Sequence, residues 1–161
     1  MQSTAYLTPL YRITLAALLG SLMGLGSGCA TTGDRYSGLP QSTAGESMLV
    51  IYRGDSTAAQ LRNIEFRIGS KALAVLPNNS HTIFTLVPGT YQVEAQQTAW
   101  LGIQEMKPIT TQVDCQQAQR CFVRYAITND GSHISHRIAT VSAEVAEKEL
   151  SSTRYAEPLP K

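Results

Sequence analysis

Residues 64–86 read IEFRIGSKALAVLPNNSHTIFTL, and this stretch decides the fold. Its first five residues alternate between apolar and polar, so three apolar side chains point to the same side of an extended strand. Gly69-Ser70 then has the composition of a two-residue hairpin loop. Residues 77–80 (PNNS) have the composition of a turn. The stretch therefore predicts three short strands joined by tight turns.

Similar β-rich runs, separated by turn residues, continue on both sides of this stretch. Together they predict strands at residues 48–53, 64–68, 71–76, 81–86, 91–95, 109–113, 121–127 and 134–141. About seven to eight short strands with turns between them indicate an all-β protein, and we expect an antiparallel β-sandwich. Residues 141–150 (VSAEVAEKEL) instead repeat with helical spacing, which predicts one short C-terminal α-helix packed on the sandwich.

The N-terminal residues have the pattern of a secretory signal peptide. Arg12 is followed by an apolar run at residues 13–25, which is too short to span a membrane. The run leads into the sequence LGSGC at residues 25–29, which resembles the bacterial lipobox, in which small residues precede the cysteine that is acylated and exposed by cleavage. Gly26 stands where leucine is usual. We expect Cys29 to carry the lipid; the alternative is an ordinary cleaved signal with a cysteine nearby.

These signals divide the chain into four parts. We expect a lipoprotein signal peptide at residues 1–28, the lipidated cysteine with a flexible tether at 29–46, the sandwich with its helix at 47–154, and a loose tail at 155–161. The tether is expected because residues 30–46 are rich in Gly, Ser and Thr and lack apolar periodicity. Ala30 follows the cysteine where aspartate would retain an enterobacterial lipoprotein in the inner membrane. By that resemblance we expect the outer membrane, on its periplasmic face.

The three cysteines form an odd number, which the lipid accounts for. If Cys29 is acylated, Cys115 and Cys121 remain, and a pair in the oxidising periplasm is expected to form a disulfide. The alternative use of a cysteine pair is a metal site. Five intervening residues do not match the usual spacing of paired zinc ligands.

The charge of the chain argues against nucleic acid as a partner. The chain has 13 basic and 12 acidic residues, and removal of the signal with its single Arg12 leaves 12 of each. No basic run occurs in the sequence, whereas binding to nucleic acid draws its affinity from neutralised phosphates. We therefore expect no nucleic-acid partner.

The sequence offers little that could support catalysis or bind a metal. His133 and His136 are three residues apart on a predicted strand, where their side chains would point to opposite faces and could not share an ion. Single acids such as Glu65, Glu94 and Asp114 are typical of a solvated strand face. We expect no metal, no cofactor and no enzymatic activity.

Two features are candidates for a partner-binding surface. Trp100, Leu101 and Ile103 lie in a segment without strand periodicity, and tryptophan is enriched at interface hot spots. The alternative is that Trp100 fills the open end of the sandwich. Arg53 ends the first predicted strand, where it could project toward a partner, make a structural ion pair or bond to loop carbonyls.

The strand and turn motifs also resemble a known family. Tyr52-Arg53, the hairpin around Gly69, the turn at Asn78-Asn79 and the run Pro88-Gly89-Thr90-Tyr91 are similar to motifs of the domain of unknown function 2846 family of proteobacterial lipoproteins. The resemblance covers about residues 47–154. This chain departs from it in having Gly69-Ser70 for the usual Asp-Gly hairpin, and a cysteine-flanked loop at residues 115–121. The resemblance implies a prealbumin-like sandwich and a lipoprotein, and it implies no particular chemistry.

Taken together, these features predict two classes of function. The first is a lipid-anchored envelope protein that acts as a structural or interaction module, held in the membrane through its N-terminal lipid and docked on another envelope protein. The second is a ligand-binding module for a glycan, a peptide or an enzyme to be inhibited. A concave face lined by Trp100 and tyrosines would favour the second class.

Overall fold

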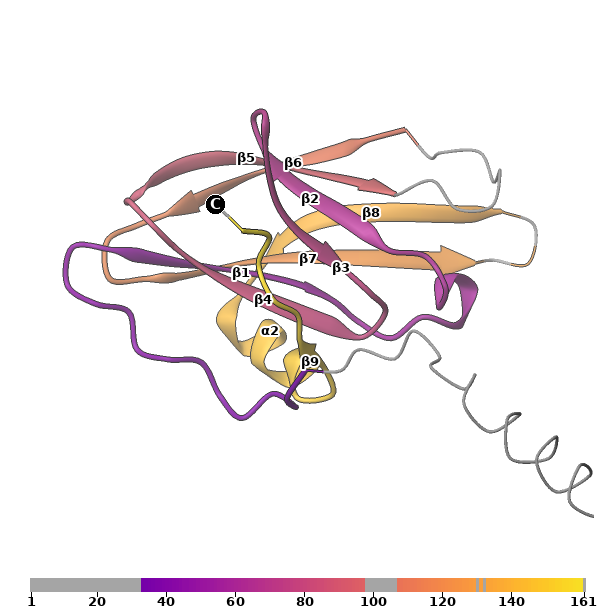
Figure 1. Ribbon diagram of the computed structural model, residues 1–161, viewed down its shortest axis with the longest axis horizontal. Helices are drawn as coiled ribbons and strands as arrows, with labels where there is room; N and C mark the ends of the chain where they lie inside the picture. Colours follow the sequence, from indigo (N-terminus) through magenta and orange to yellow (C-terminus); the bar gives the residue numbers. More distant parts are fainter. Residues whose placement is uncertain (1–32, 98–106, 130, 132, 161) are drawn as a thin grey trace, which may run out of the picture. The chain divides into compact units, whose positions relative to one another are not determined.

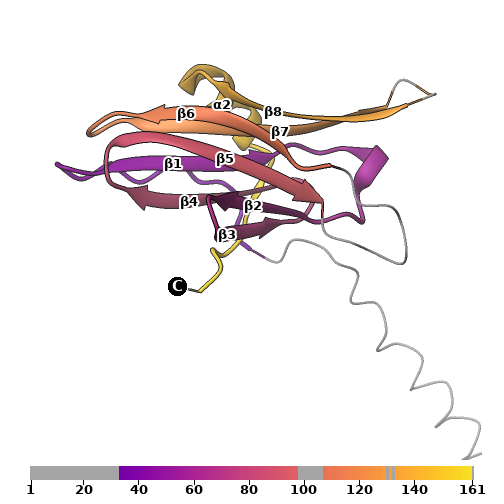
Figure 2. The same cartoon turned by 90° about the horizontal axis from the view of Figure 1, so that it is seen from above.

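Two β-sheets packed face to face form the framework of the described residues (Figure 1, Figure 2). The computed structural model describes residues 33–97, 107–129, 131 and 133–160, without the side chain of Ala59. These residues belong to a unit that spans Thr31–Lys161.

The strands divide between the two sheets as follows. The five-stranded sheet, in the order β8-β7-β1-β4-β9, contains β1 (Ser47–Arg53), β4 (Ser80–Leu86), β7 (Arg120–Asn129), β8 (Ile134–Val141) and β9 (Arg154–Tyr155). The four-stranded sheet, in the order β3-β2-β5-β6, contains β2 (Ile64–Ile68), β3 (Lys71–Leu76), β5 (Gly89–Gln97) and β6 (Ile109–Cys115). A short 3-10 helix, η2 (Thr57–Ala59), and the helix α2 (Ala143–Leu150) complete the elements.

The predicted all-β sandwich with a C-terminal helix is confirmed. β2 and β3 form the expected hairpin, with Gly69 at a φ of +57° in its loop. Among the described residues, five of the seven strand pairings are antiparallel. The pairings of β1 with β7 and of β4 with β9 are parallel, and each joins strands that are distant in the sequence. The prealbumin-like relationship itself rests on the family resemblance and stays a prediction.

The main core lies between the two sheets. Alternate residues of each strand face it, so Leu49 and Ile51 of β1 meet Ile64 and Phe66 of β2, and all four are fully buried. The strict alternation that predicted β2 is therefore the alternation between core and solvent. Burial of this apolar area is the dominant favourable contribution to folding.

A second apolar cluster lies on the opposite face of the five-stranded sheet. It contains Met48, Val50, Tyr52, Phe122, Ala146 and Leu150, with Tyr36, Leu39, Ile83 and Val141 packed against them. The helix α2 covers this face, and it starts two residues later than the sequence predicts because Val141 still belongs to β8. Ser142 caps the helix, and its hydroxyl accepts from Val145 N at 3.4 Å. Within the described residues, no helix has the length and apolar character needed to cross a membrane.

Residues 33–46 also lie on this face, and we call them the strap. Tyr36 N donates to Thr153 O at 3.0 Å, and Arg120 Nη2 donates to Pro40 O at 3.1 Å. The prediction of a flexible tether over residues 30–46 is therefore wrong for the strap. Two side chains, Tyr36 and Leu39, pack on the second apolar cluster, and main-chain hydrogen bonds supply the rest of the attachment. Neither kind of attachment requires a periodic pattern of apolar residues in the sequence.

The strap begins at a close approach between two backbones. A Cβ on Gly33 would lie 1.8 Å from Tyr155 O, which no side chain can accommodate. Gly33 O accepts from Arg154 Nη1 at 3.1 Å, and Asp34 O accepts from Tyr155 N at 2.8 Å. Glycine is therefore required where the strap first meets β9.

Gly33→Ala is expected to release the start of the strap from β9. Loss of the two hydrogen bonds should lower the free energy of unfolding by about 1–3 kcal/mol. Urea denaturation measures the loss, and hydrogen exchange at Tyr155 N should become faster. Ser37→Ala, at an exposed strap position, is the control and should change neither quantity. Unchanged exchange at Tyr155 in the Gly33 variant would contradict this description of the strap.

The C-terminal residues are paired rather than loose. Arg154–Tyr155 form β9, Ala156 N donates to His81 O at 2.8 Å, and Leu159 N donates to Leu73 O at 2.8 Å. The expectation of a loose tail over residues 155–161 is wrong for the described residues 155–160. Backbone pairing to β4 and β3 holds this segment, so its polar, proline-rich composition did not reveal it.

Candidate functional site

Four of the predicted site residues lie outside the described residues. They are Cys29, the predicted lipid attachment site, and Trp100, Leu101 and Ile103, the predicted partner-binding group. Whether Trp100 fills the end of the sandwich or contacts a partner stays open. The structure does place Arg53 and the two remaining cysteines.

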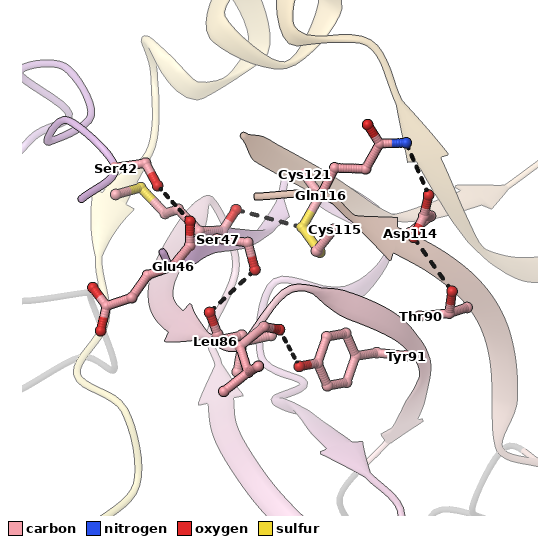
Figure 3. The surroundings of a disulfide bond; sticks show 12 residues. Ser42, Glu46, Ser47, Leu86, Thr90, Tyr91, Asp114, Cys115, Gln116 and Cys121 are labelled. Carbon is pink, nitrogen blue, oxygen red and sulfur yellow. Dashed lines mark hydrogen bonds between the residues drawn. A yellow bond between two sulfur atoms is a disulfide. The ribbon is translucent and has the colours of Figure 1, made fainter. Parts of the chain in front are cut away.

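Cys115 and Cys121 form the disulfide that the cysteine count predicts (Figure 3). Their Cα atoms are 5.4 Å apart, which is an ordinary span for a disulfide. Cys115 ends β6 and Cys121 lies at the start of β7, so the bond links the two sheets at one end of the sandwich. Both cysteines are buried.

The loop closed by the disulfide docks on the start of β1. Ala118, at a φ of +57°, donates from its N–H to Glu46 O at 2.8 Å. Met48 N in turn donates to Gln119 O at 3.0 Å. Figure 3 shows Glu46 and Ser47 beside the disulfide, where the strap continues into β1. The disulfide therefore also secures the C-terminal end of the strap.

Arg53 is buried and does not project toward a partner. Its side chain is only 1 % exposed and lies at one end of the inner core. Its guanidinium donates to Arg62 O and, at 3.5 Å, to Leu76 O. Both carbonyls flank the four-stranded sheet, so Arg53 joins the two sheets. The hypothesis that Arg53 binds a partner is wrong, because the last residue of β1 faces inward, and the alternative that Arg53 bonds to carbonyls is confirmed.

A polar groove of about 310 Å³ is the candidate site with the most charged residues. It lies between the loop that follows β1, the strand β7 and the end of α2, and its lining includes Asp55, Arg124, Glu149 and Ser152. Arg124 Nη1 donates to Glu149 Oε1 at 2.7 Å, while Tyr52 OH donates to Glu149 Oε2 at 2.5 Å. Both carboxylate oxygens of Glu149 are thus bound by side chains of the five-stranded sheet.

The ionisation of the tyrosines agrees with a structural role for this network. Burial, assisted by the hydrogen bond to Glu149, raises the pKa of Tyr52 well above its ordinary value, so Tyr52 remains a neutral donor. Burial also raises the pKa of Tyr125 to about 12. Neither phenol is available as a base near neutral pH.

The two serines that line the groove do not have the environment of nucleophiles. Ser56 Oγ donates to Ile127 O at 3.3 Å, and Ser152 Oγ lies 3.3 Å from Glu149 O. An activated serine instead needs a base that accepts its proton. The groove can therefore offer hydrogen bonds and charge to a polar ligand, and its described residues form no nucleophile–base pair.

A second groove, of about 490 Å³, lies beside the disulfide. It runs between β6 and β8 to the start of α2, and Asp114, Arg120, Thr140 and Ser142 contribute to its lining. Arg120 already makes a 3.6 Å ion pair with Glu147 and holds the strap. Asp114 also has partners within the protein, since it accepts from Thr90 Oγ1 and from Gln116 Nε2, both at 3.3 Å.

The two histidines of the H-x-x-H sequence do not come together as metal ligands. His136 lies in β8, where its Nδ1 is 3.2 Å from Tyr125 OH, and His133 precedes the strand. In the part of the chain that the structure describes, no three His, Cys, Asp or Glu side chains are grouped closely enough to hold a metal ion.

His81 is a buried polar group that sequence analysis did not identify. It is 4 % exposed and lies between Tyr36 of the strap and Tyr155 of β9, at ring-centroid distances of 5.6 and 5.7 Å. Its Nδ1 is 2.8 Å from Thr153 Oγ1, which itself donates to Leu150 O at 2.7 Å. Thr153 can therefore only accept from His81, so Nδ1 carries the proton. A histidine in a β-rich run gives no signal of this role.

Acid is expected to weaken the structure at His81. Burial lowers the pKa of His81 below its ordinary value of 6.5, so the unfolded chain binds a proton more readily than the folded chain as the pH falls below 6.5. The stability that the neutral His81 contributes above pH 6.5 is then progressively lost as the pH falls. Between about pH 7.5 and about pH 5.5, urea midpoints should fall less for His81→Asn than for the wild type.

His136 provides the control for this experiment. Burial also lowers its pKa, so it contributes to the acid sensitivity without touching the strap. Because His136 does not touch the strap, hydrogen exchange of the strap amides at acid pH should be the same in His136→Asn as in the wild type. Identical pH dependence in the wild type and in His81→Asn would refute the assignment to His81.

Comparisons with known proteins add no relative to these observations. No model of a known protein family matches the chain, and no curated protein matches it either. The residues described above therefore carry the functional argument by themselves.

Proposed function

We propose that this protein is a non-enzymatic, lipid-anchored lipoprotein on the periplasmic face of the bacterial outer membrane. One observation carries the proposal: Cys115 and Cys121 are bonded to each other. Disulfides form and persist in oxidising compartments such as the periplasm. The remaining cysteine, Cys29, directly follows an apolar run and small residues, which is the position of an acylated cysteine.

Labelling with radioactive palmitate tests this anchor. The wild type should incorporate label, and Cys29→Ser should lose it and remain unprocessed. Ser27→Ala, which keeps a small residue before the cleavage position, is the matched control and should label normally. Continued labelling of Cys29→Ser would show that the lipid is not on Cys29.

Membrane fractionation tests the proposed location. The wild type should sediment with the outer membrane, because Ala30 does not match the retention signal. Ala30→Asp should shift the protein to the inner membrane. Recovery of the wild type in the inner membrane would contradict the outer-membrane assignment and leave the lipid anchor intact.

At the membrane, the domain acts as a structural or interaction module that docks on another envelope component. The charged side chains of the two grooves support this assignment, since Arg124, Glu149 and Arg120 are already engaged in ion pairs within the domain. Cross-linking in intact cells should give a discrete heteromeric product that Cys29→Ser abolishes. A product set that is the same with and without the anchor would count against docking.

A ligand-binding module is the second candidate, and the groove that contains Arg124 and Glu149 favours it. Its volume of about 310 Å³ is at the lower end of the range for small-molecule sites. Glu149→Gln should then change the affinity for a polar ligand such as a glycan fragment, as measured by calorimetry. Equal affinities of the wild type and of Glu149→Gln would exclude this groove as the ligand-binding site.

A further inference from the structure

We propose that the edge of the domain formed by the start of the strap and β9 faces the membrane surface, with the domain held directly against the lipid headgroups. This inference rests on the proposed lipid at Cys29. It follows from where the strap begins, since the predicted tether over residues 30–46 is largely bound to the domain.

The start of the strap is fixed to the domain from its first described residue. Gly33 and Asp34 accept hydrogen bonds from Arg154 and Tyr155, and Tyr36 packs on His81. The contact between Gly33 and Tyr155 O leaves no space even for a methyl group. The strap from Gly33 onward therefore belongs to the folded domain. Only residues 30–32, which we call the leash, connect Cys29 to it.

Only three residues, 30–32, then separate Cys29 from Gly33. Four peptide units span at most about 13–14 Å even when fully extended. The acyl chains of a lipidated cysteine are buried in the bilayer, which places the cysteine at the headgroup level. Gly33 and the adjacent β9 must therefore lie within about 14 Å of that level.

The length of the leash, rather than charge, sets this orientation. Near the proposed contact edge, Arg35 and Arg154 provide two basic groups, while Asp34 and Glu157 provide two acidic groups. Their charges offset one another, so attraction to anionic lipid is weak. The bilayer that carries the anchor occupies this edge because the leash is short.

The opposite side of the domain then points away from the membrane. In Figure 1 the tip of the β2–β3 hairpin lies at the top of the view and β9 in its lower part, so the tip is remote from β9. The hairpin and the exposed polar face of the four-stranded sheet would thus be presented to the periplasm. A partner would have to approach from that side.

Energy transfer from the domain to the membrane tests the orientation. The lipidated protein is reconstituted in vesicles of phosphatidylethanolamine and phosphatidylglycerol that contain an acceptor-labelled phosphatidylethanolamine. A donor dye is attached through Asp34→Cys at the strap or through Ser70→Cys at the hairpin tip, both exposed positions. The strap label should transfer several-fold more efficiently than the hairpin label.

A lengthened leash provides the matched control. Ten Gly/Ser residues inserted between Ala30 and Thr31 would give the leash a root-mean-square span of roughly 20 Å. Transfer from the strap label should then fall toward that of the hairpin label. Equal transfer from both labels in the wild type, or no change on insertion, would overturn the proposed orientation.

Failure of the lipid anchor is distinguished by flotation of the same samples. A protein that does not float with the vesicles and carries no palmitate would contradict the proposed function itself. A protein that floats but transfers equally from both labels would contradict the orientation alone.

Discussion

Arg53→Ala is expected to lower the free energy of unfolding by about 3–5 kcal/mol. The side chain is 1 % exposed and fills one end of the inner core, so its truncation leaves a cavity. It also leaves the carbonyls of Arg62 and Leu76 without the guanidinium that binds them. Urea denaturation measures the loss directly.

An exposed arginine gives the comparison for this result. Arg35→Ala removes the same side chain from the surface of the strap and should change stability by about 0.5 kcal/mol or less. If Arg53→Ala were no more destabilising than Arg35→Ala, Arg53 would not join the two sheets as described.

The double variant Cys115→Ala/Cys121→Ala is expected to lose about 2–3 kcal/mol of stability. The disulfide closes a short loop and links the two sheets, so its removal increases the conformational entropy of the unfolded chain. Hydrogen exchange at Ala118 N, which donates to Glu46 O, should also become faster. The loss of stability and the faster exchange both follow from opening the loop between Cys115 and Cys121, which secures the strap.

Chemical reduction of the wild type should reproduce the result of the double variant. Gln117→Ala, at an exposed position of the same loop, is the control and should leave the urea midpoint unchanged. Titration of free thiols in the unreduced protein would contradict the disulfide, and so would equal midpoints for the reduced and oxidised forms.

The strands could be predicted because alternation in the sequence reports burial. Ile64 and Phe66 face the core while Glu65 and Arg67 pair with each other on the outer face, as a period of two requires. The hairpin at Gly69 and the disulfide were predictable for equally local reasons. The parallel pairing of β1 with β7 could not be predicted in this way, because it joins strands that are more than sixty residues apart.

The candidate site was harder to predict because its contacts are not periodic. The strap is attached by main-chain hydrogen bonds and by Tyr36 and Leu39, within a stretch whose Gly, Ser and Thr content is typical of a linker. The sequence left open whether Arg53 projects toward a partner or makes structural contacts, because arginine is rarely buried, and only the carbonyls at the other sheet explain its position. Neither fact can be read from local composition.

Mass spectrometry of the mature protein extracted from membranes tests the central claim most directly. The lipid-anchor account predicts a chain that begins at Cys29, carries acyl groups on that residue and contains the Cys115–Cys121 disulfide. A mature chain that begins at another residue, or an unmodified Cys29, would contradict it.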